Sequence, residues 1–443
     1  MPSRARRCWS LISRTQKILA GGTDSDRPRL RHDACVTTET RARLQRGLVV
    51  VGIVVLAFNL RPAAVSVGPV LSDVSDGLGM TAAETGVLTS LPVLAFAVFG
   101  ALAPRLARLV GLHRLTLVAL LAVVGGLWLR PTVTSVPLFL ALSLLALAGM
   151  ASANVLMPSL VKLHFPDRVG LMTAIYSTAL AIGLTSASVL TVPISESFDG
   201  WSSGLVAWSF TAAIAVLPWL GLIGHDRKPE EVKGHIGLLD VARTRLGWMM
   251  ALFFGLQSLQ AYSIFGWFAE LYQEAGFSAH TSGLLLGVIT GVSIPLSFLI
   301  PSIAARVHSQ AVLICSVMAC YPIGYIGLMV APSGALAWVW AVLVGVGTTT
   351  FPLILTLLGL RARTPAGTAA LSGFAQSTGY LIAGTGPFSV GLLHDLSGGW
   401  TVPLLALLLL NIPQLWLGLA VSRPAYIEDE LTDTAPHRTR PGR

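Results

Sequence analysis

The sequence has few charged residues and few cysteines, and each shortage excludes a class of protein. Only 12% of its 443 residues are charged, whereas 53% are hydrophobic. A water-soluble domain with so little charge could not cover its surface with polar groups. The 4 cysteines predict no disulfide framework and no metal site, because two lie in the polar N-terminal segment and two lie in one apolar run. The composition is therefore that of a membrane protein.

Motifs that carry chemistry are also missing. The sequence has no G-x-x-x-x-G-K-[ST] phosphate loop, no H-E-x-x-H pair and no G-x-S-x-G elbow. No Asp or Glu occupies the centre of an apolar run, so no carboxylate pair is expected at mid-membrane depth. We therefore expect a protein that is not an enzyme and that uses no ATPase loop, no metal and no cofactor.

What the sequence contains in abundance is long apolar runs. About twelve runs of roughly 20 residues, the length that an α-helix needs to cross the hydrocarbon core, fill residues 46–423. Their positions are 48–70, 86–106, 112–129, 136–161, 169–194, 205–223, 248–271, 282–305, 311–330, 335–360, 366–393 and 402–421. The sequence therefore predicts an all-α membrane protein with twelve transmembrane helices.

The basic residues gather in alternate loops. If the first helix starts in the cytoplasm, the cytoplasmic segments receive nearly all the Lys and Arg of the loops, and the opposite segments hold only Arg130. This asymmetry predicts that both termini are cytoplasmic. The net charge of +9 is then a topology signal and indicates no nucleic-acid partner. We expect the partners to be the lipid bilayer and a small-molecule substrate, and the protein to be a monomer.

The longest polar interruption divides the runs six and six. It covers residues 225–245, which we expect to link an N-terminal six-helix bundle at 46–224 to a C-terminal one at 246–423. The halves echo each other at an offset of about two hundred residues, since Pro158 corresponds to Pro352 and Tyr176 to Gln376. A common offset is typical of a duplicated six-helix unit.

The two ends of the chain are polar. Residues 1–45 are interpreted as a disordered cytoplasmic tail, with an over-extended translation start and an Arg-rich targeting segment as alternatives. Residues 424–443 are interpreted as a second cytoplasmic tail.

One charge lies inside an apolar run, in the sequence Asn59-Leu60-Arg61-Pro62. Arg61 follows Arg46 by about 22 Å along a helix, beyond the bilayer midplane but still within the hydrocarbon. A charge at such depth costs about 3 kcal/mol or more. An anionic or strongly polar substrate could supply the counter-charge, because a guanidinium offers a planar fork of donors and keeps its proton. The alternative is a structural Arg61 that satisfies carbonyls freed by Pro62 or extends towards the headgroups.

Other polar side chains in the runs are candidate substrate contacts. Gln257 and Gln260 share one helix face and precede Tyr262; substrate binding and helix–helix hydrogen bonding both fit them. The same two roles apply to Asn154, Tyr176, Gln376 and Tyr380. The full set of candidate substrate-binding residues is Arg61, Asn59, Asn154, Gln257, Gln260, Tyr262, Gln376 and Tyr380. The candidate gating residues, at the cytoplasmic side, are Arg105, Arg108, Arg361 and Arg363.

Several stretches resemble one transporter family. They include Asn59-Leu60-Arg61-Pro62, Leu88-Thr89-Ser90-Leu91-Pro92 and Phe165-Pro166-Asp167-Arg168-Val169-Gly170. Across residues 46–423 the chain resembles the cyanate permease and 2-nitroimidazole transporter family of the major facilitator superfamily. The resemblance implies two pseudo-symmetric six-helix bundles around one central site, in a secondary transporter of a bacterial plasma membrane.

The superfamily's loop motif between the second and third helices survives only in part, at residues 100–108. Pro104 stands at the position of its usual Asp and Ala107 at that of its second Gly. The departure removes the usual acidic partner of Arg105 or Arg108.

These features together predict a secondary active transporter that moves a small anion or polar heterocycle, cyanate-like or nitroimidazole-like, by alternating access. The alternative among transporters is a multidrug-type exporter of neutral or cationic compounds, against which the lack of a mid-membrane carboxylate counts. A membrane enzyme and a passive channel are alternatives from other classes. Proton symport and facilitated exchange both stay open, because few titratable groups lie in the runs.

Overall fold

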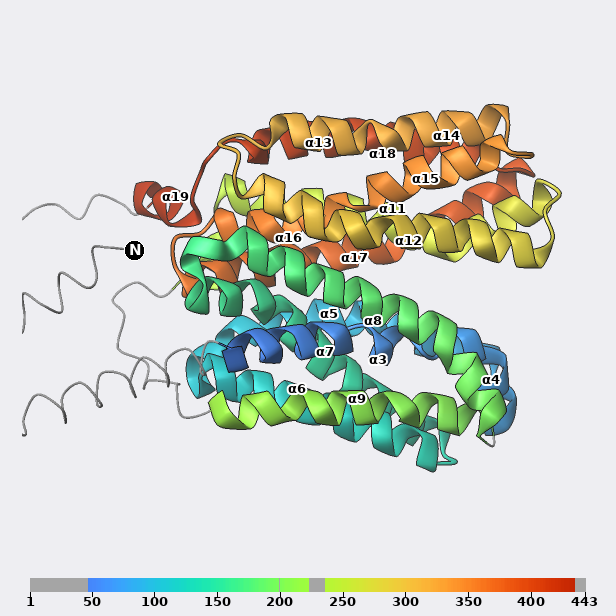
Figure 1. Ribbon diagram of the computed structural model, residues 1–443, viewed down its shortest axis with the longest axis horizontal. Coiled ribbons are helices and arrows are strands. Elements are labelled where there is room, and N and C mark those ends of the chain that lie inside the picture. The colour runs from blue at the N-terminus through green and yellow to red at the C-terminus, as the bar shows by residue number, and fades with distance from the viewer. Residues whose placement is uncertain (1–46, 199, 223–235, 435–443) are drawn as a thin grey trace, which may run out of the picture. The chain divides into compact units, whose positions relative to one another are not determined.

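Long helices make up most of the described part of the computed structural model (Figure 1). The structure describes residues 47–198, 200–222 and 236–434, and these ranges contain no strand. The chain divides into two units after Leu48, and the described residues of the first unit, Gly47 and Leu48, are helical. The expected tail at 1–45, most of the expected linker at 225–245 and residues 435–443 lie outside the described residues.

The first half of the described chain contains six membrane-length segments, of which the first is broken. Residues 47–59 are helical, and α3 (Pro62–Val65), η1 (Gly68–Val70) and α4 (Leu71–Leu78) follow. Pro62 occupies the first turn of α3, where a missing backbone N–H is tolerated, so a new helix begins there. The other five segments are α5 (Ala82–Val110), α6 (Leu112–Leu129) with η2 (Arg130–Thr132), α7 (Val136–His164), α8 (Val169–Ser197) after η3 (Pro166–Arg168), and α9 (Trp201–Leu222).

The second half repeats this count. After the four-residue α10 (Leu238–Val241) come α11 (Arg245–Glu274), α12 (Ala279–Ala304), the pair α13 (Ala311–Met318) and α14 (Cys320–Val330), the pair α15 (Leu336–Thr348) and α16 (Thr350–Leu360), α17 (Pro365–Ser397) and α18 (Thr401–Ser422). A short helix, α19 (Ile427–Thr434), follows the last span. Part of the expected tail at 424–443 is therefore helical.

Each apolar run of the sequence corresponds to helix in the described residues. Ten of the helical spans are long and apolar enough to cross a membrane. The remaining two, α11 with 30 residues and α17 with 33, are also long enough but more polar, and they carry five of the candidate site residues. The expected all-α fold with twelve transmembrane helices is confirmed.

The helices form two groups, which we call the first bundle (the segments up to α9) and the second bundle (α11 to α18). In Figure 1 the first bundle occupies the lower part of the view and the second the upper part. The bundles meet where α8 packs on α12 and where α5 and α7 pack on α17. We call the end with α19 the basic end, because the helix ends and connections there carry Arg105, Arg168 and Arg306, and the end with α4 the acidic end.

Two glycines bring α11 and α17 into close contact. A Cβ atom added to Gly255 of α11 would lie 3.1 Å from the Cα atom of Gly379 on α17. Small residues permit such close approach of membrane helices. The ring centroids of Tyr262 and Tyr380, which these helices carry, lie 6.3 Å apart.

The acidic helix α19 caps both of these helices at the basic end. Glu428 accepts hydrogen bonds from the backbone N–H groups of Arg363 and Thr364, both at 3.0 Å, and from the Thr364 hydroxyl at 2.9 Å. Glu430 accepts one from the Leu246 N–H at 3.1 Å, in the first turn of α11. A carboxylate at a helix N-terminus is stabilised by the unsatisfied N–H groups and the helix dipole. The helix α19 therefore stabilises the starts of α11 and α17.

We expect Glu428→Gln to lower the thermal unfolding midpoint of the detergent-purified protein. The amide retains the shape of the side chain but loses the charge that strengthens its bonds to the start of α17, a loss of about 1 kcal/mol for a partly exposed group. Fluorimetric melting measures the effect. The matched control is Asp76→Asn, an exposed carboxylate of α4; an equal shift in both variants would contradict the capping role.

Candidate functional site

Arg61 lies in the break of the first span and faces the second bundle. Its side chain is half-buried, immediately before α3. The Cζ atom lies 5.4 Å from the ring centroid of Phe351 on α16, within the range of a cation–π contact. Tyr380 on α17 and Tyr262 on α11 interact with the guanidinium electrostatically. A cation of one bundle thus meets three aromatic side chains of the other.

No carboxylate neutralises Arg61 within the described part of the chain. The ion pairs of that part lie elsewhere, at Arg363 with Asp429 and at His394 with Glu274 and Asp395. The partners of Arg61 among the described residues are the phenols of Tyr380 and Tyr262 and the ring of Phe351. A guanidinium in such surroundings retains its capacity to bind an anion or a strong hydrogen-bond acceptor.

The aromatic side chains around Arg61 form one cluster, which we call the aromatic cluster: Phe96, Phe254, Tyr262, Phe351 and Tyr380. Ring centroids lie 4.0 Å apart for Phe96 and Tyr380, 5.1 Å for Phe254 and Tyr380, and 5.7 Å for Phe254 and Phe351. The Tyr380 hydroxyl makes no hydrogen bond of normal geometry to the described residues, and it interacts electrostatically with Arg61 and Asn154. The cluster offers flat apolar faces next to a cation and an available hydroxyl.

Two candidates, Asn154 and Gln376, join the bundles directly. Asn154 Nδ2 on α7 donates a hydrogen bond of 2.7 Å to Gln376 Oε1 on α17. Towards the basic end, Ser372 Oγ donates to the Val155 carbonyl at 2.9 Å, and Ser159 Oγ donates to the Pro365 carbonyl at 2.7 Å. These three bonds hold α7 and α17 together from the level of the site to the basic end.

The structure does not bring Gln257 and Gln260 to Arg61. Both are fully buried in a hydrogen-bonded network inside the second bundle. Gln257 donates to the Tyr321 hydroxyl at 3.0 Å and to the Thr348 carbonyl at 3.2 Å. Gln414 links the two glutamines, because it donates to Gln257 at 2.7 Å and accepts from Gln260. These amides join helices of one bundle.

Asn59 also forms its hydrogen bonds within its own bundle, the first. Its Nδ2 atom donates to the carbonyls of Val55 at 2.8 Å and Thr211 at 3.1 Å, and its Oδ1 atom accepts from the Thr211 hydroxyl at 2.7 Å. Tyr176, which the sequence also marks as a polar group within an apolar run, is buried on α8.

The role of Arg130 could not be predicted from the sequence. Its side chain is fully buried and donates hydrogen bonds to the Ala63 carbonyl at 3.3 Å and to Ser66 Oγ at 3.0 Å, both just after the break at Pro62. The structural role that we considered for Arg61 therefore falls to Arg130. The one sequence signal was its exceptional position, as a basic residue at the acidic end.

The candidate gating residues differ in their surroundings. Arg105 is exposed, and Arg108 donates to the Ile236 carbonyl at 3.0 Å. Arg361 is buried and bonds the Val421 carbonyl at 2.9 Å; burial lowers its pKa below the usual value, and Tyr426 opposes that shift. Arg363 pairs with Asp429 of α19 at 2.8 Å. All four lie at the basic end.

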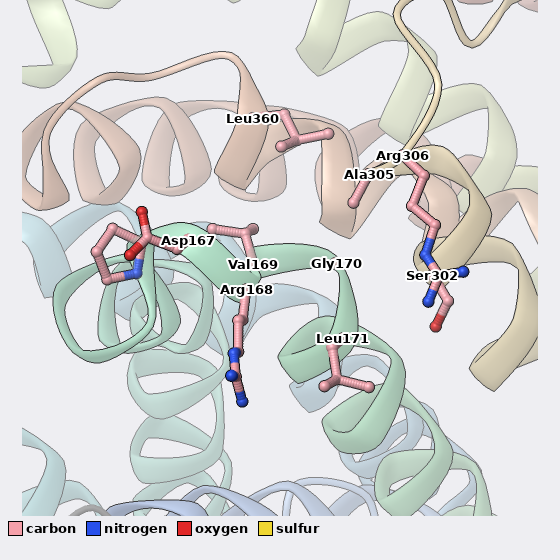
Figure 2. Close-up of a pocket in the computed structure, with 10 residues that line it drawn as sticks. Asp167, Arg168, Val169, Gly170, Leu171, Ser302, Ala305, Arg306 and Leu360 are labelled. Carbon is pink, nitrogen blue, oxygen red and sulfur yellow. The ribbon is translucent and has the colours of Figure 1, made fainter. Parts of the chain in front are cut away.

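One cavity lies at the basic end, and Arg61 is not among the residues that line it. Its volume is about 350 Å³, and residues at the start of α8 and at the end of α12 line it. Figure 2 shows Asp167 and Arg168 on one side of this cavity and Ser302 and Arg306 on the other. The cavity is a cleft between the bundles and is separate from the candidate site.

Comparison with known proteins agrees with this architecture. Residues 49–387 match the family described as the Major Facilitator Superfamily. A 2-nitroimidazole transporter of Escherichia coli is 32% identical over 85% of this chain and 96% of its own length. The uncharacterized transporter YycB of Bacillus subtilis is 35% identical over 87% of this chain and 96% of its own. The cyanate transport protein CynX of Escherichia coli is 28% identical over 79% and 90%.

Solved structures share the fold at low sequence identity. The Escherichia coli fucose:proton symporter FucP aligns with a TM-score of 0.70 at 14% identity, over 86% of this chain and 99% of that one. The human organic anion transporter MFSD10 aligns with a TM-score of 0.66 at 16% identity, over 84% and 99%. The chain therefore belongs to the major facilitator superfamily, in the family of the cyanate and 2-nitroimidazole transporters, and is a multi-pass membrane transporter.

Proposed function

We propose that this transporter moves a small anion or a polar heterocycle across the plasma membrane by alternating access. The observation that carries the proposal is the setting of Arg61, a half-buried cation that faces the second bundle and pairs with no carboxylate of the described residues. Cyanate is an anion, and the nitro group of a nitroimidazole presents acceptor oxygens. A guanidinium can bind either of these compounds, and two of the relatives are named for them.

In this proposal Arg61 binds the negative or acceptor end of the substrate. The aromatic cluster stacks on the remainder of the molecule, and the hydroxyls of Tyr262 and Tyr380 provide hydrogen bonds. Asn154 is the next contact, because it interacts with Tyr380, and Gln376 follows through its bond to Asn154. A flat heterocycle would use the stacking faces, whereas cyanate would depend mainly on the charge.

Alternating access requires that the contacts at the basic end break and re-form. The three bonds between α7 and α17 join the bundles in the present conformation. We infer that the cycle opens them while each bundle keeps its internal network, so that the bundles rock about the site. Arg105, Arg108, Arg361 and Arg363, which lie at that end, would then hold or release the gate.

We expect Arg61→Gln to reduce uptake of cyanate or 2-nitroimidazole into proteoliposomes by more than about tenfold, which corresponds to about 1.4 kcal/mol of lost interaction. Arg61→Lys should recover only part of the rate, because an ammonium retains the charge without the planar fork. Initial rates at several substrate concentrations measure the effect.

The control for this charge removal is Arg423→Gln, at an exposed position after α18. It should transport at the wild-type rate. Full activity in both Arg61 variants would exclude Arg61 from the site. Increased resistance of an overexpressing strain to lipophilic cations, together with unaffected Arg61 variants, would favour the multidrug alternative.

We expect two further variants to separate substrate contacts from bundle contacts. Tyr380→Phe should raise KM severalfold without lowering the unfolding midpoint, because its hydroxyl has no protein partner of normal geometry. Gln260→Leu should lower the midpoint, because it leaves buried groups of Gln414 and Tyr325 unpaired at a cost of about 1–3 kcal/mol. Melting curves and transport kinetics, measured on the same preparations, test both expectations. If Tyr380→Phe lowered the midpoint and Gln260→Leu raised only KM, Tyr380 would be the bundle contact and Gln260 the substrate contact.

The distribution of basic residues supports a topology with both termini in the cytoplasm and the basic end on the cytoplasmic side. We expect a cysteine introduced at Asp76 of α4 to react with a membrane-impermeant maleimide in whole cells and one at Arg306 to react only after lysis, in a chain whose native cysteines are replaced by serine. Labelling in the opposite order would reverse the proposed orientation.

A further inference from the structure

The position of Arg61 depends on how the broken first span is held on each side of the break. On the upstream side the helix at residues 47–59 is well anchored. Asn59 exchanges hydrogen bonds with Thr211 of α9, and a Cβ atom at Gly183 of α8 would collide with the Phe58 carbonyl, so the two backbones touch there. Asn59, two residues before Arg61, is therefore fixed in place.

On the downstream side the chain is held much less tightly by packing. The helix α3 has only four residues, Pro62–Val65, too few to be stable by itself. It contacts α7 and α8 on one side, but a cavity of about 140 Å³ separates it from Leu88 and Pro92 of α5 on another. A cavity of that volume is far larger than the roughly 10–15 Å³ that one water requires, so close packing does not fix α3 there.

Arg130 makes the specific contacts that hold this segment. Its Nη1 atom bonds the Ala63 carbonyl and its Nη2 atom bonds Ser66 Oγ, at 3.3 and 3.0 Å. The side chain is 0% exposed and pairs with no carboxylate of the described residues, so these two bonds are its principal compensation for burial. Ala63 is two residues from Arg61, and the backbone between them contains Pro62, whose φ angle the ring restrains.

We propose that Arg130 is a positioning residue for the site: by bonding Ala63 and Ser66 it fixes the break so that the Arg61 guanidinium faces Phe351 and Tyr380. The inference rests on the proposed function of Arg61. Arg130 touches no substrate in this account and acts only through Arg61. A purely structural Arg130 would stabilise the first bundle without affecting where Arg61 lies.

The first test is a double-mutant cycle on substrate affinity. Arg130→Gln should raise KM for cyanate or 2-nitroimidazole about tenfold in the wild-type background, which corresponds to about 1.4 kcal/mol. In the Arg61→Lys background it should have an effect below about twofold, because residues that act through one another are not additive. Additive effects on KM would overturn the proposal. Arg130→Lys, which retains the charge and can still bond one of the two acceptors, replaces Arg130→Gln should the latter fail to fold.

The second test needs no substrate, so it separates failure of this inference from failure of the proposed function. In a chain whose 4 native cysteines are replaced by serine, Arg61→Cys is labelled with a methanethiosulfonate reagent, with and without Arg130→Lys. We expect Arg130→Lys to raise the labelling rate about threefold or more. The weaker contacts to Ala63 and Ser66 would let the segment around position 61 open more often. An unchanged rate would overturn the proposal even if no transported substrate has been found.

A matched control addresses stability. Trp208→Phe removes another buried hydrogen bond of the first bundle, from Trp208 Nε1 to Thr191 Oγ1 at 3.0 Å, which involves neither Ala63 nor Ser66. It should lower the unfolding midpoint while leaving KM and the labelling of position 61 unchanged. If Trp208→Phe shifts KM and labelling as Arg130→Lys does, the effect reflects general destabilisation and the proposal fails.

Discussion

The architecture depends on how a broken helix and a cation are accommodated at hydrocarbon depth. A spanning helix normally satisfies its own backbone, and an interruption leaves polar groups that lipid cannot serve. At the break, Arg130 bonds the Ala63 carbonyl and the Ser66 hydroxyl, and Asn59 attaches the preceding helix to α9. Because Asn59 and Arg130 make the contacts on either side of the break, the Arg61 guanidinium is left to extend across the bundle interface.

The buried polar groups fall into two kinds. Gln257, Gln260 and Gln414 belong to a network inside one bundle, in which each amide has protein partners. Arg61 and Tyr380 lie at the interface, where the Tyr380 hydroxyl keeps unused hydrogen-bonding capacity. A saturated network stiffens the body that contains it, whereas contacts across the interface can exchange for contacts to a ligand. This division suits a carrier in which two rigid bundles move against each other.

The basic end shows how the chain tolerates an altered loop motif. Pro104, at the position of the usual acid, packs against Gly373 of α17 and offers no charge. The start of α17 nevertheless receives a carboxylate, from Glu428 of α19. Glu428 also attracts Lys162 of α7, so the same side chain lies between elements of both bundles. The exposed N–H groups of a helix start require an anion or a cap, and the segment that supplies it can change.

The sequence alone determined the class of the fold. Run length and the scarcity of charge predicted the spans, because hydrocarbon selects for apolar length and for little else. The same reasoning identified Arg61, since a charge within such a run is conspicuous. From the sequence, the polar residues of α11 and α17 formed one set of candidates. In the structure, Gln257 and Gln260 face the interior of the second bundle, whereas Tyr262 and Tyr380 face Arg61.

Only the tertiary structure decided which polar groups meet. Asn154 and Gln376 lie 222 residues apart and form one hydrogen bond, and Arg130, counted along the chain as a loop residue, is fully buried against the break. Hydropathy reports how much of a segment avoids water, and this quantity is the same whichever neighbour buries it. The hydrogen-bond partner of a buried polar side chain depends on how helices distant in sequence pack together. The periodicity of residues along one helix contains no information on that packing.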